Sequence, residues 1–235
     1  MVKINSVSKP LWKTLSGVKL CSLKLEKPEL GKIRAEVSHL KDYNYAINLF
    51  TSNGTRIGKE FFGLYPDENR IFGFNIETLK SFRGKFRLGE LLRLISIMEM
   101  IENKINLFQI FSKDTAVYFH FRYGFKPDIR QFAHRDNNLE TISNDSRFPD
   151  FAQTAKILIK KVREHSGGEE MRKICRITSV LTEEYMKRVK QLNPQEQKLH
   201  PFTFGFDMKL TKEDVLKEKD LFNRLFKNHG IDYTI

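Results

Sequence analysis

Apolar and polar residues alternate in the N-terminal half of the chain, which is the pattern of strands with one buried face. The clearest run covers residues 45–50, and the pair Asn53-Gly54 after it predicts a tight turn, because both residues tolerate a positive φ. A return strand is predicted over residues 55–65 and a third strand over residues 70–79. We therefore predict an antiparallel meander, preceded by a short helix over 6–18 and strands over 19–25 and 33–40.

The hydrophobic period changes at Leu88, where apolar residues begin to recur at helical spacing. This stripe predicts a packed helix whose polar side consists of Glu90, Arg93, Ser96, Glu99 and Glu102. The apolar run over residues 105–111 then predicts a buried strand. Strand, helix and strand in this order form a crossover unit, so the strands over 70–79 and 105–111 should be parallel.

The remainder of the chain is predicted to be mostly helical. A short helix over 113–122 ends near Gly124, and the polar stretch 131–149 indicates a loop or linker. Helices are expected over 151–165 and 169–192, the second interrupted near Thr178-Ser179, followed by a strand over 202–210 that is a candidate addition to the sheet. Thr211 to Asp214 resembles a capping box for a last helix that Gly230 closes. We therefore divide the chain into a domain of residues 1–130 and a C-terminal extension of residues 131–235.

Composition limits the classes of function. The 235 residues carry 41 Lys and Arg against 29 Asp and Glu, and a net charge of +12 favours acidic partners. The basic residues are scattered and follow no nucleic-acid motif, so a solvated basic surface is the simpler interpretation. No apolar run has the length of a membrane helix or a signal peptide, and Cys21 and Cys175 lack the spacing of metal or redox pairs. We expect a cytoplasmic protein without a metal.

The stretch from Lys80 to Arg93 has the chemistry of an anion site. It contains five basic side chains and one acid, Glu90, and it leads into the predicted helix. The first N–H groups of a helix lack internal partners, and the helix dipole is positive there. The alternative is a charged loop in front of a core helix, because Gly-x-x-x-x-Gly without a following Lys-Ser/Thr is unspecific.

Two motifs within residues 44–129 resemble the GNAT superfamily of N-acetyltransferases. Phe82-Arg83-Gly84-Lys85 with Leu91-Leu92 is similar to the family's Tyr-Arg-Gly-Lys-Gly-x-Gly-x-x-Leu-Leu. Residues 116–127, Ala-Val-Tyr-Phe-His-Phe-Arg-Tyr-Gly-Phe-Lys-Pro, are similar to its Ala-Ile-x-Phe-Tyr-x-Lys-x-Gly-Phe-x-Pro. The resemblance covers a little over a third of the chain and leaves residues 131–235 unmatched.

The resemblance implies an α/β fold, with a mixed, mostly antiparallel sheet flanked by helices and a helical C-terminal extension. It also implies that acetyl-CoA binds with its pyrophosphate on the backbone of residues 83–89. The chain departs from the family at Phe86 and Leu88, which stand at glycine positions, and at Lys113, which often is Asn. The implied cofactor-binding residues are Thr78, Arg83, Gly84, Lys85, Phe86, Arg87, Leu88, Gly89 and Lys113.

Three residues are candidates for catalysis. His120 stands where the family often has a Tyr that protonates the departing thiolate, although a histidine on a packed helix is also commonly structural. Tyr123, three residues further on, shares a helix face with His120 and could replace it, or simply belong to the core. On the strand over 70–79, Phe72, Phe74 and Ile76 should share one face. Glu77 would then lie on the other face, where it could take a proton from an amine or form a surface ion pair.

Two functions follow from these observations. The first is transfer of an acetyl group from acetyl-CoA to an amine, with backbone N–H groups at the end of strand 70–79 stabilising the oxyanion. The second is a GNAT-like binding module for a protein or for an acidic partner such as RNA. The filled glycine positions, His120 and the basic segment 151–200, which has eleven Lys and Arg against six Asp and Glu, motivate the second function.

Overall fold

The computed structural model describes residues 7–27, 30–83, 86–113, 116, 119–120, 122–127, 138–164, 168–192 and 205–235. The chain divides into two compact units. Unit 1 contains Met1–Gln109 and Leu210–Ile235, and unit 2 contains Ile110–Lys209. This division differs from the sequence-based boundary at residue 130, since the chain returns to unit 1 from Leu210 onward.

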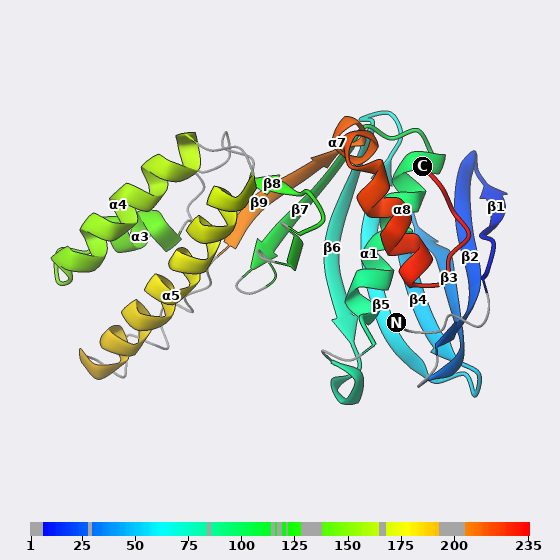
Figure 1. Cartoon of the computed structure of the whole chain (residues 1–235), viewed down its shortest axis with the longest axis horizontal. Helices are drawn as coiled ribbons and strands as arrows, with labels where there is room; N and C mark the ends of the chain where they lie inside the picture. Colours follow the sequence, from blue (N-terminus) through cyan, green and yellow to red (C-terminus); the bar gives the residue numbers. More distant parts are fainter. Residues whose placement is uncertain are drawn as a thin grey trace. The chain divides into compact units, whose positions relative to one another are not determined.

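Unit 1 is built on an antiparallel meander (Figure 1). Each strand pairs with the next, as the alternating pattern predicts. The expected helix over 6–18 is wrong. Trp12 pairs with Cys21 in an edge hairpin that turns at Ser16 and Gly17, whose φ angles are 48° and 80°. The strands are β1 (Leu11–Leu15), β2 (Val18–Lys27), β3 (Gly31–Lys41), β4 (Asn44–Thr51), β5 (Arg56–Tyr65) and β6 (Arg70–Thr78).

Helix α1 (Leu88–Glu102) covers one face of this meander, and every residue from Leu91 to Met100 is buried. The polar side of the helix is largely enclosed as well, since Glu90, Arg93, Ser96 and Glu99 are all buried. Arg93 and Glu99 face the sheet, where they pair with Glu60 of β5 and Cys21 of β2. Glu90 instead meets the C-terminal segment, in which α7 (Lys212–Lys217) and α8 (Lys219–Asn228) follow in sequence. Figure 1 shows α8 beside α1 on the same side of the sheet, and Phe222 and Phe226 of α8 are fully buried.

The crossover from β6 to β7 (Leu107–Lys113) passes through the 3-10 turn η1 (Lys80–Phe82) and α1. At the start of both strands, Asn106 N donates to Asn69 Oδ1 at 2.7 Å and Arg70 Nη1 donates to Gln109 Oε1 at 3.3 Å. Since the two starts lie together, β6 and β7 run in the same direction, which confirms the predicted parallel pair.

Unit 2 contains the helices α3 (Asn138–Asn144), α4 (Pro149–Glu164) and α5 (Gly168–Leu192). The predicted loop over 131–149 is wrong in part, because α3 forms there, and residues 131–137 lie outside the described residues. The predicted break near Thr178 is also wrong. Its hydroxyl donates to Ile174 O at 2.7 Å, so it bonds within the helix and α5 continues. Between helices, the Tyr185 hydroxyl donates to Asp145 Oδ2 at 2.7 Å.

Two further predictions concern the C-terminal strand and the capping box that follows it. Strand β8 (Lys126–Pro127) pairs antiparallel with β9 (Gly205–Thr211). The capping box is confirmed, since Thr211 Oγ1 accepts from Asp214 N at 3.0 Å and Asp214 Oδ2 accepts from Thr211 N at 3.2 Å. The protein is thus a mixed α/β protein with a mostly antiparallel sheet flanked by helices, as expected.

Candidate functional site

The turn between η1 and α1 has an unusual backbone. Phe86 and Arg87 are consecutive left-handed residues with φ angles of 57° and 53°, a conformation that favours glycine. Arg87 is the N-cap of α1 and its side chain makes no capping hydrogen bond. The first intrahelical bond is donated by Leu91 N to Arg87 O at 3.0 Å, so the N–H groups of residues 88–90 point out of the helix end. Gly84 and Lys85 lie outside the described residues.

The two bulky residues at glycine positions have different environments. Leu88 is buried in the core of unit 1, so its side chain is directed away from the turn surface. Phe86 is half-buried, and its ring centroid lies 6.0 Å from that of Phe82. Gly89 is half-buried, whereas Arg83 and Arg87 are exposed. Two cations and a helix N-terminus therefore border the turn, which is the chemistry of a phosphate site.

A cluster of charged and polar side chains, in which Glu90 and His229 are buried, lies behind this turn. In the first turn of α1, Glu90 Oε1 lies 2.7 Å from His229 Nε2 and 3.5 Å from Arg87 Nη1. Lys27 Nζ lies 2.8 Å from His229 Nδ1. Burial lowers the pKa of Lys27 to about 8 and also lowers the pKa of His229. Sequence reasoning missed this cluster, because His229 is 139 residues from Glu90 and no local pattern joins them.

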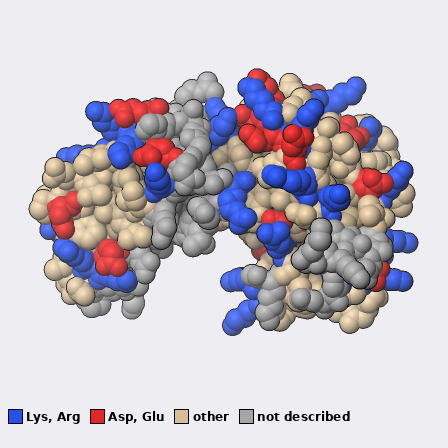
Figure 2. Space-filling model, viewed as in Figure 1, with Lys and Arg blue, Asp and Glu red and all other residues tan. Residues whose placement is uncertain are grey.

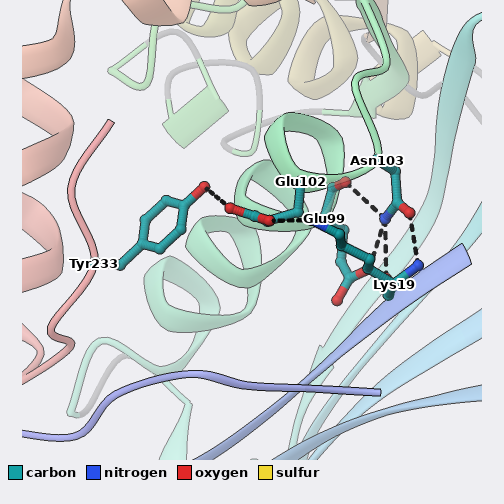
Figure 3. Close-up of polar contacts among 5 residues, drawn as sticks. All are labelled: Lys19, Glu99, Glu102, Asn103 and Tyr233. Carbon is teal, nitrogen blue, oxygen red and sulfur yellow. Dashed lines mark hydrogen bonds and ion pairs between the residues drawn. The ribbon is translucent and has the colours of Figure 1, made fainter. Parts of the chain in front are cut away.

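The other polar side chains of α1 are also paired. Arg93 Nη1 donates to Glu60 Oε1 of β5 at 2.7 Å inside the core, and burial raises the pKa of Glu60. Towards the other end of the helix, Glu99 accepts from Cys21 N at 2.7 Å. Figure 3 shows the contacts at this end, where Glu102 accepts from Lys19 at 2.9 Å and from the Tyr233 hydroxyl at 3.1 Å.

Strand β6 carries a β-bulge. Phe61 pairs with Asn75 and Phe62 pairs with Gly73, so Phe74 is the extra residue and its side chain is 50% exposed. The predicted shared face is right for Phe72 and Phe74, whose ring centroids lie 5.3 Å apart. It is wrong for Ile76, because the bulge shifts the alternation and places Ile76 opposite the buried Glu60. The ring borders a pocket of 370 Å³ lined by Leu40, Lys41, Asn44, Tyr45, Phe61, Phe62 and Phe74.

Glu77 and Thr78 lie at the end of β6, beyond the bulge. Glu77 is exposed and accepts from Asn75 Nδ2 at 2.7 Å, while Thr78 is half-buried. Lys59 of β5 is directly opposite Glu77 in the ladder. Glu77 therefore lies on an open sheet face, which is compatible both with taking a proton from an amine and with a surface ion pair.

His120 and Tyr123 belong to unit 2 and lie close together there. Both rings contact Phe119, with centroids 5.1 and 5.0 Å away. His120 is buried, and its Nδ1 lies 2.8 Å from Ser112 Oγ. Tyr123 is also buried. The positions 116, 119 and 120 of the predicted short helix are helical, and the side chain of Lys113 lies outside the described residues. Of the three residues that the sequence suggested for catalysis, His120 and Tyr123 thus belong to unit 2 and Glu77 belongs to unit 1.

No family model matches the chain, and no curated protein matches it either. Among solved structures it is similar to nourseothricin acetyltransferase at 12% identity and a TM-score of 0.34, over 52% of this chain and 71% of that one. It is similar to Tetrahymena GCN5 at 12% identity and a TM-score of 0.35, over 40% of this chain and 61% of that one. It is also similar to PaiA N-acetyltransferase from Thermoplasma acidophilum in complex with coenzyme A, at 18% identity and a TM-score of 0.31, over 36% of this chain and 53% of that one. The last two similarities span less than two thirds of those proteins.

The described residues contain neither a membrane-spanning helix nor a cluster of metal ligands. No helix in the described ranges is both long and apolar enough to cross a membrane. Within the same ranges, His, Cys, Asp and Glu side chains form no group of three or more that could hold a metal ion.

Proposed function

We propose that this protein is an acyl-CoA-dependent N-acetyltransferase of the GNAT type, with an amine as acceptor. The observation that carries the proposal is the backbone at the start of α1. Phe86, at a position where the resemblance places glycine, adopts the left-handed conformation that glycine favours, and the helix N-terminus after it has no side-chain cap from Arg87. The left-handed backbone at Phe86 supports the proposal at the position where the residue type departs from the family.

The described residues of the turn fit the diphosphate of acetyl-CoA. The N–H groups of Leu88 and Gly89 would donate to phosphate oxygens, and Arg83 and Arg87 would supply positive charge. Glu90, the one acid in the sequence from Lys80 to Arg93, is close to His229 and Arg87, so its negative charge is balanced within the protein. Acetyl-CoA would supply an acetyl group already activated as a thioester.

The remaining residues would act on the acceptor. The amine would attack the thioester carbonyl, forming the C–N bond and breaking the C–S bond. The bulge at Phe74 takes backbone groups of β6 out of the regular ladder, and an N–H there could stabilise the oxyanion. Glu77 is our candidate for taking the proton of the amine, and His120 or Tyr123 for returning a proton to the thiolate. The aromatic pocket beside Phe74 is the candidate site for the amine.

Calorimetric titration with coenzyme A tests this proposal. The wild type should bind, and the double substitution Arg83→Ala with Arg87→Ala should weaken binding at least tenfold, because each lost charge-assisted hydrogen bond is worth about 1.5–3 kcal/mol. Lys13→Ala, which removes an exposed cation from the edge strand β1, should leave the affinity unchanged. Absence of heat with the wild type at near-millimolar coenzyme A would overturn the proposal.

A binding module for another macromolecule is the second candidate function. Its support is in unit 2, where Ile157, Ile177 and Val180 expose about half of their side chains to solvent. Figure 2 shows Lys and Arg distributed among Asp and Glu on the visible face rather than gathered in one patch, which favours a protein partner over RNA. Fluorescence anisotropy with single-stranded RNA at two salt concentrations separates the two, because phosphate contacts weaken steeply with salt.

A further inference from the structure

Three side chains from distant segments meet behind the turn. Lys27 ends β2, Glu90 lies in the first turn of α1, and His229 follows α8. His229 is between the other two, 2.8 Å from Lys27 Nζ through Nδ1 and 2.7 Å from Glu90 Oε1 through Nε2. The His229 and Glu90 side chains are 1% and 4% exposed. The cluster belongs entirely to unit 1 and connects the C-terminal segment to the start of α1.

One protonation pattern satisfies every member of this cluster. A Lys27 ammonium group can only donate, so His229 Nδ1 must accept, and the neutral imidazole then carries its proton on Nε2 and donates it to Glu90. Burial, which is the largest influence on the pKa of His229, favours this neutral form. The imidazole thereby links Lys27 to Glu90 through two hydrogen bonds.

The segment that carries His229 is itself held in place. Ser8 N donates to Gly230 O at 2.9 Å and Asp232 N donates to Ser8 O at 2.8 Å. Near the opposite end of α1, the Tyr233 hydroxyl donates to Glu102. The C-terminal segment therefore contacts α1 at its first turn through His229 and at its last turn through Tyr233, and only the first contact is next to the anion-binding turn.

The turn needs such support because its own backbone is strained. Left-handed conformations at Phe86 and Arg87 cost about 1–2 kcal/mol each, and Arg87 supplies no cap to hold the helix start. We propose that His229 is a positioning residue for this turn: by bridging Lys27 and Glu90 it fixes the first turn of α1, and with it the N–H groups that bind a diphosphate. The second half of this inference rests on the proposed function, whereas the first half does not.

Hydrogen exchange and coenzyme A titration test the two halves separately. The reporter is the amide of Leu91, which donates the first helical bond to Arg87 O. In the ligand-free protein, His229→Ala should speed exchange of this amide at least tenfold, and Lys27→Met, which keeps the length of the side chain but removes the ammonium group, should do so to a smaller extent. His229→Gln should restore slow exchange, because one amide group can accept from Lys27 and donate to Glu90. Tyr233→Phe, which removes only the contact with Glu102, should leave the exchange of Leu91 unchanged.

Binding of coenzyme A should follow the same order, with a loss of about tenfold in His229→Ala and recovery in His229→Gln. Unchanged exchange of Leu91 in both His229→Ala and Lys27→Met would overturn the inference. Faster exchange in a protein whose wild type does not bind coenzyme A would support the positioning role and overturn the proposed function instead. If His229→Ala does not fold, the exchange of the Leu91 amide is compared in Lys27→Met and His229→Gln. Faster exchange in Lys27→Met than in His229→Gln supports the inference, and unchanged exchange in Lys27→Met overturns it.

Discussion

At the scale of single residues, the most informative group is a carboxylic acid enclosed in the core. Glu99 lies where α1 meets β2 and accepts hydrogen bonds from Cys21 N at 2.7 Å and Asn103 Nδ2 at 3.2 Å. Burial raises the pKa of Glu99 to about 8, although these two hydrogen bonds act in the opposite direction. At neutral pH the folded protein therefore holds the protonated acid, whereas the unfolded chain releases the proton.

Glu99→Gln should remove a pH dependence of stability. The folded-state pKa is above the unfolded value near 4.5, so the contribution of Glu99 is full below pH 4.5 and is lost as pH rises through 8. Between pH 5 and 8 the wild type should lose on the order of 3 to 4 kcal/mol relative to the variant. Urea unfolding of both proteins at these two pH values measures the difference. Parallel stabilities across this range would show that Glu99 is already ionised in the fold.

At the scale of elements, the two ends of helix α1 are capped differently. Its C-terminal end is a Schellman motif, in which Ile105 N donates to Met100 O at 2.9 Å and Lys104 N donates to Ile101 O at 3.1 Å. The left-handed C′ position is occupied by Lys104, with φ of 57°, where glycine is usual. Both ends of α1 thus contain left-handed residues other than glycine, but only the N-terminal end borders the candidate site.

Lys104→Gly should stabilise the protein by about 0.5–1 kcal/mol. The side chain is exposed, so its removal costs little packing, and glycine relieves the left-handed strain at a smaller cost in backbone entropy. Lys104→Ala is the matched control and should give no such gain, because alanine keeps the Cβ atom. Urea unfolding detects both changes. Equal effects of the two substitutions would contradict the strain argument.

The elements differ in how far the sequence predicts them. The alternation in residues 44–79 and the stripe beginning at Leu88 are local patterns, and both predicted their elements correctly. The bulge at Phe74 and the left-handed conformation at Phe86 have no such signal, because their residue types favour neither feature. The short helix α3 lies within the long polar stretch before α4 and was not predicted, because seven residues are too few to show a clear hydrophobic period.

At the scale of the whole molecule, unit 1 closes its core with residues from the end of the chain. Helix α8 contributes Phe222 and Phe226, both fully buried, and His229 completes the cluster with Glu90. The sequence could not predict this return, because the contacts join residues more than a hundred positions apart and no local pattern encodes them. The same return provides the partners of Glu90 and Glu102 on α1, which are His229 and Tyr233.

Phe226→Ala should therefore destabilise unit 1 by about 3–5 kcal/mol, the usual cost of removing a fully buried phenylalanine. Phe74→Ala removes the same side chain from a half-exposed position and should cost less than about 1 kcal/mol. Thermal or urea unfolding compares the two. A small loss in Phe226→Ala would show that the C-terminal helix is not part of the cooperative core.

The turn before α1 is the proposed binding site for the diphosphate of a CoA thioester, and the proposed function depends most on it. Backbone amide NMR of the wild type during addition of coenzyme A tests it directly, because the amides of Leu88 and Gly89 are the proposed donors. We expect the largest shifts at Leu88, Gly89 and Glu90, with none at Lys104 at the other end of the helix. Saturable shifts elsewhere in unit 1 with Leu88 and Gly89 unmoved would contradict the account.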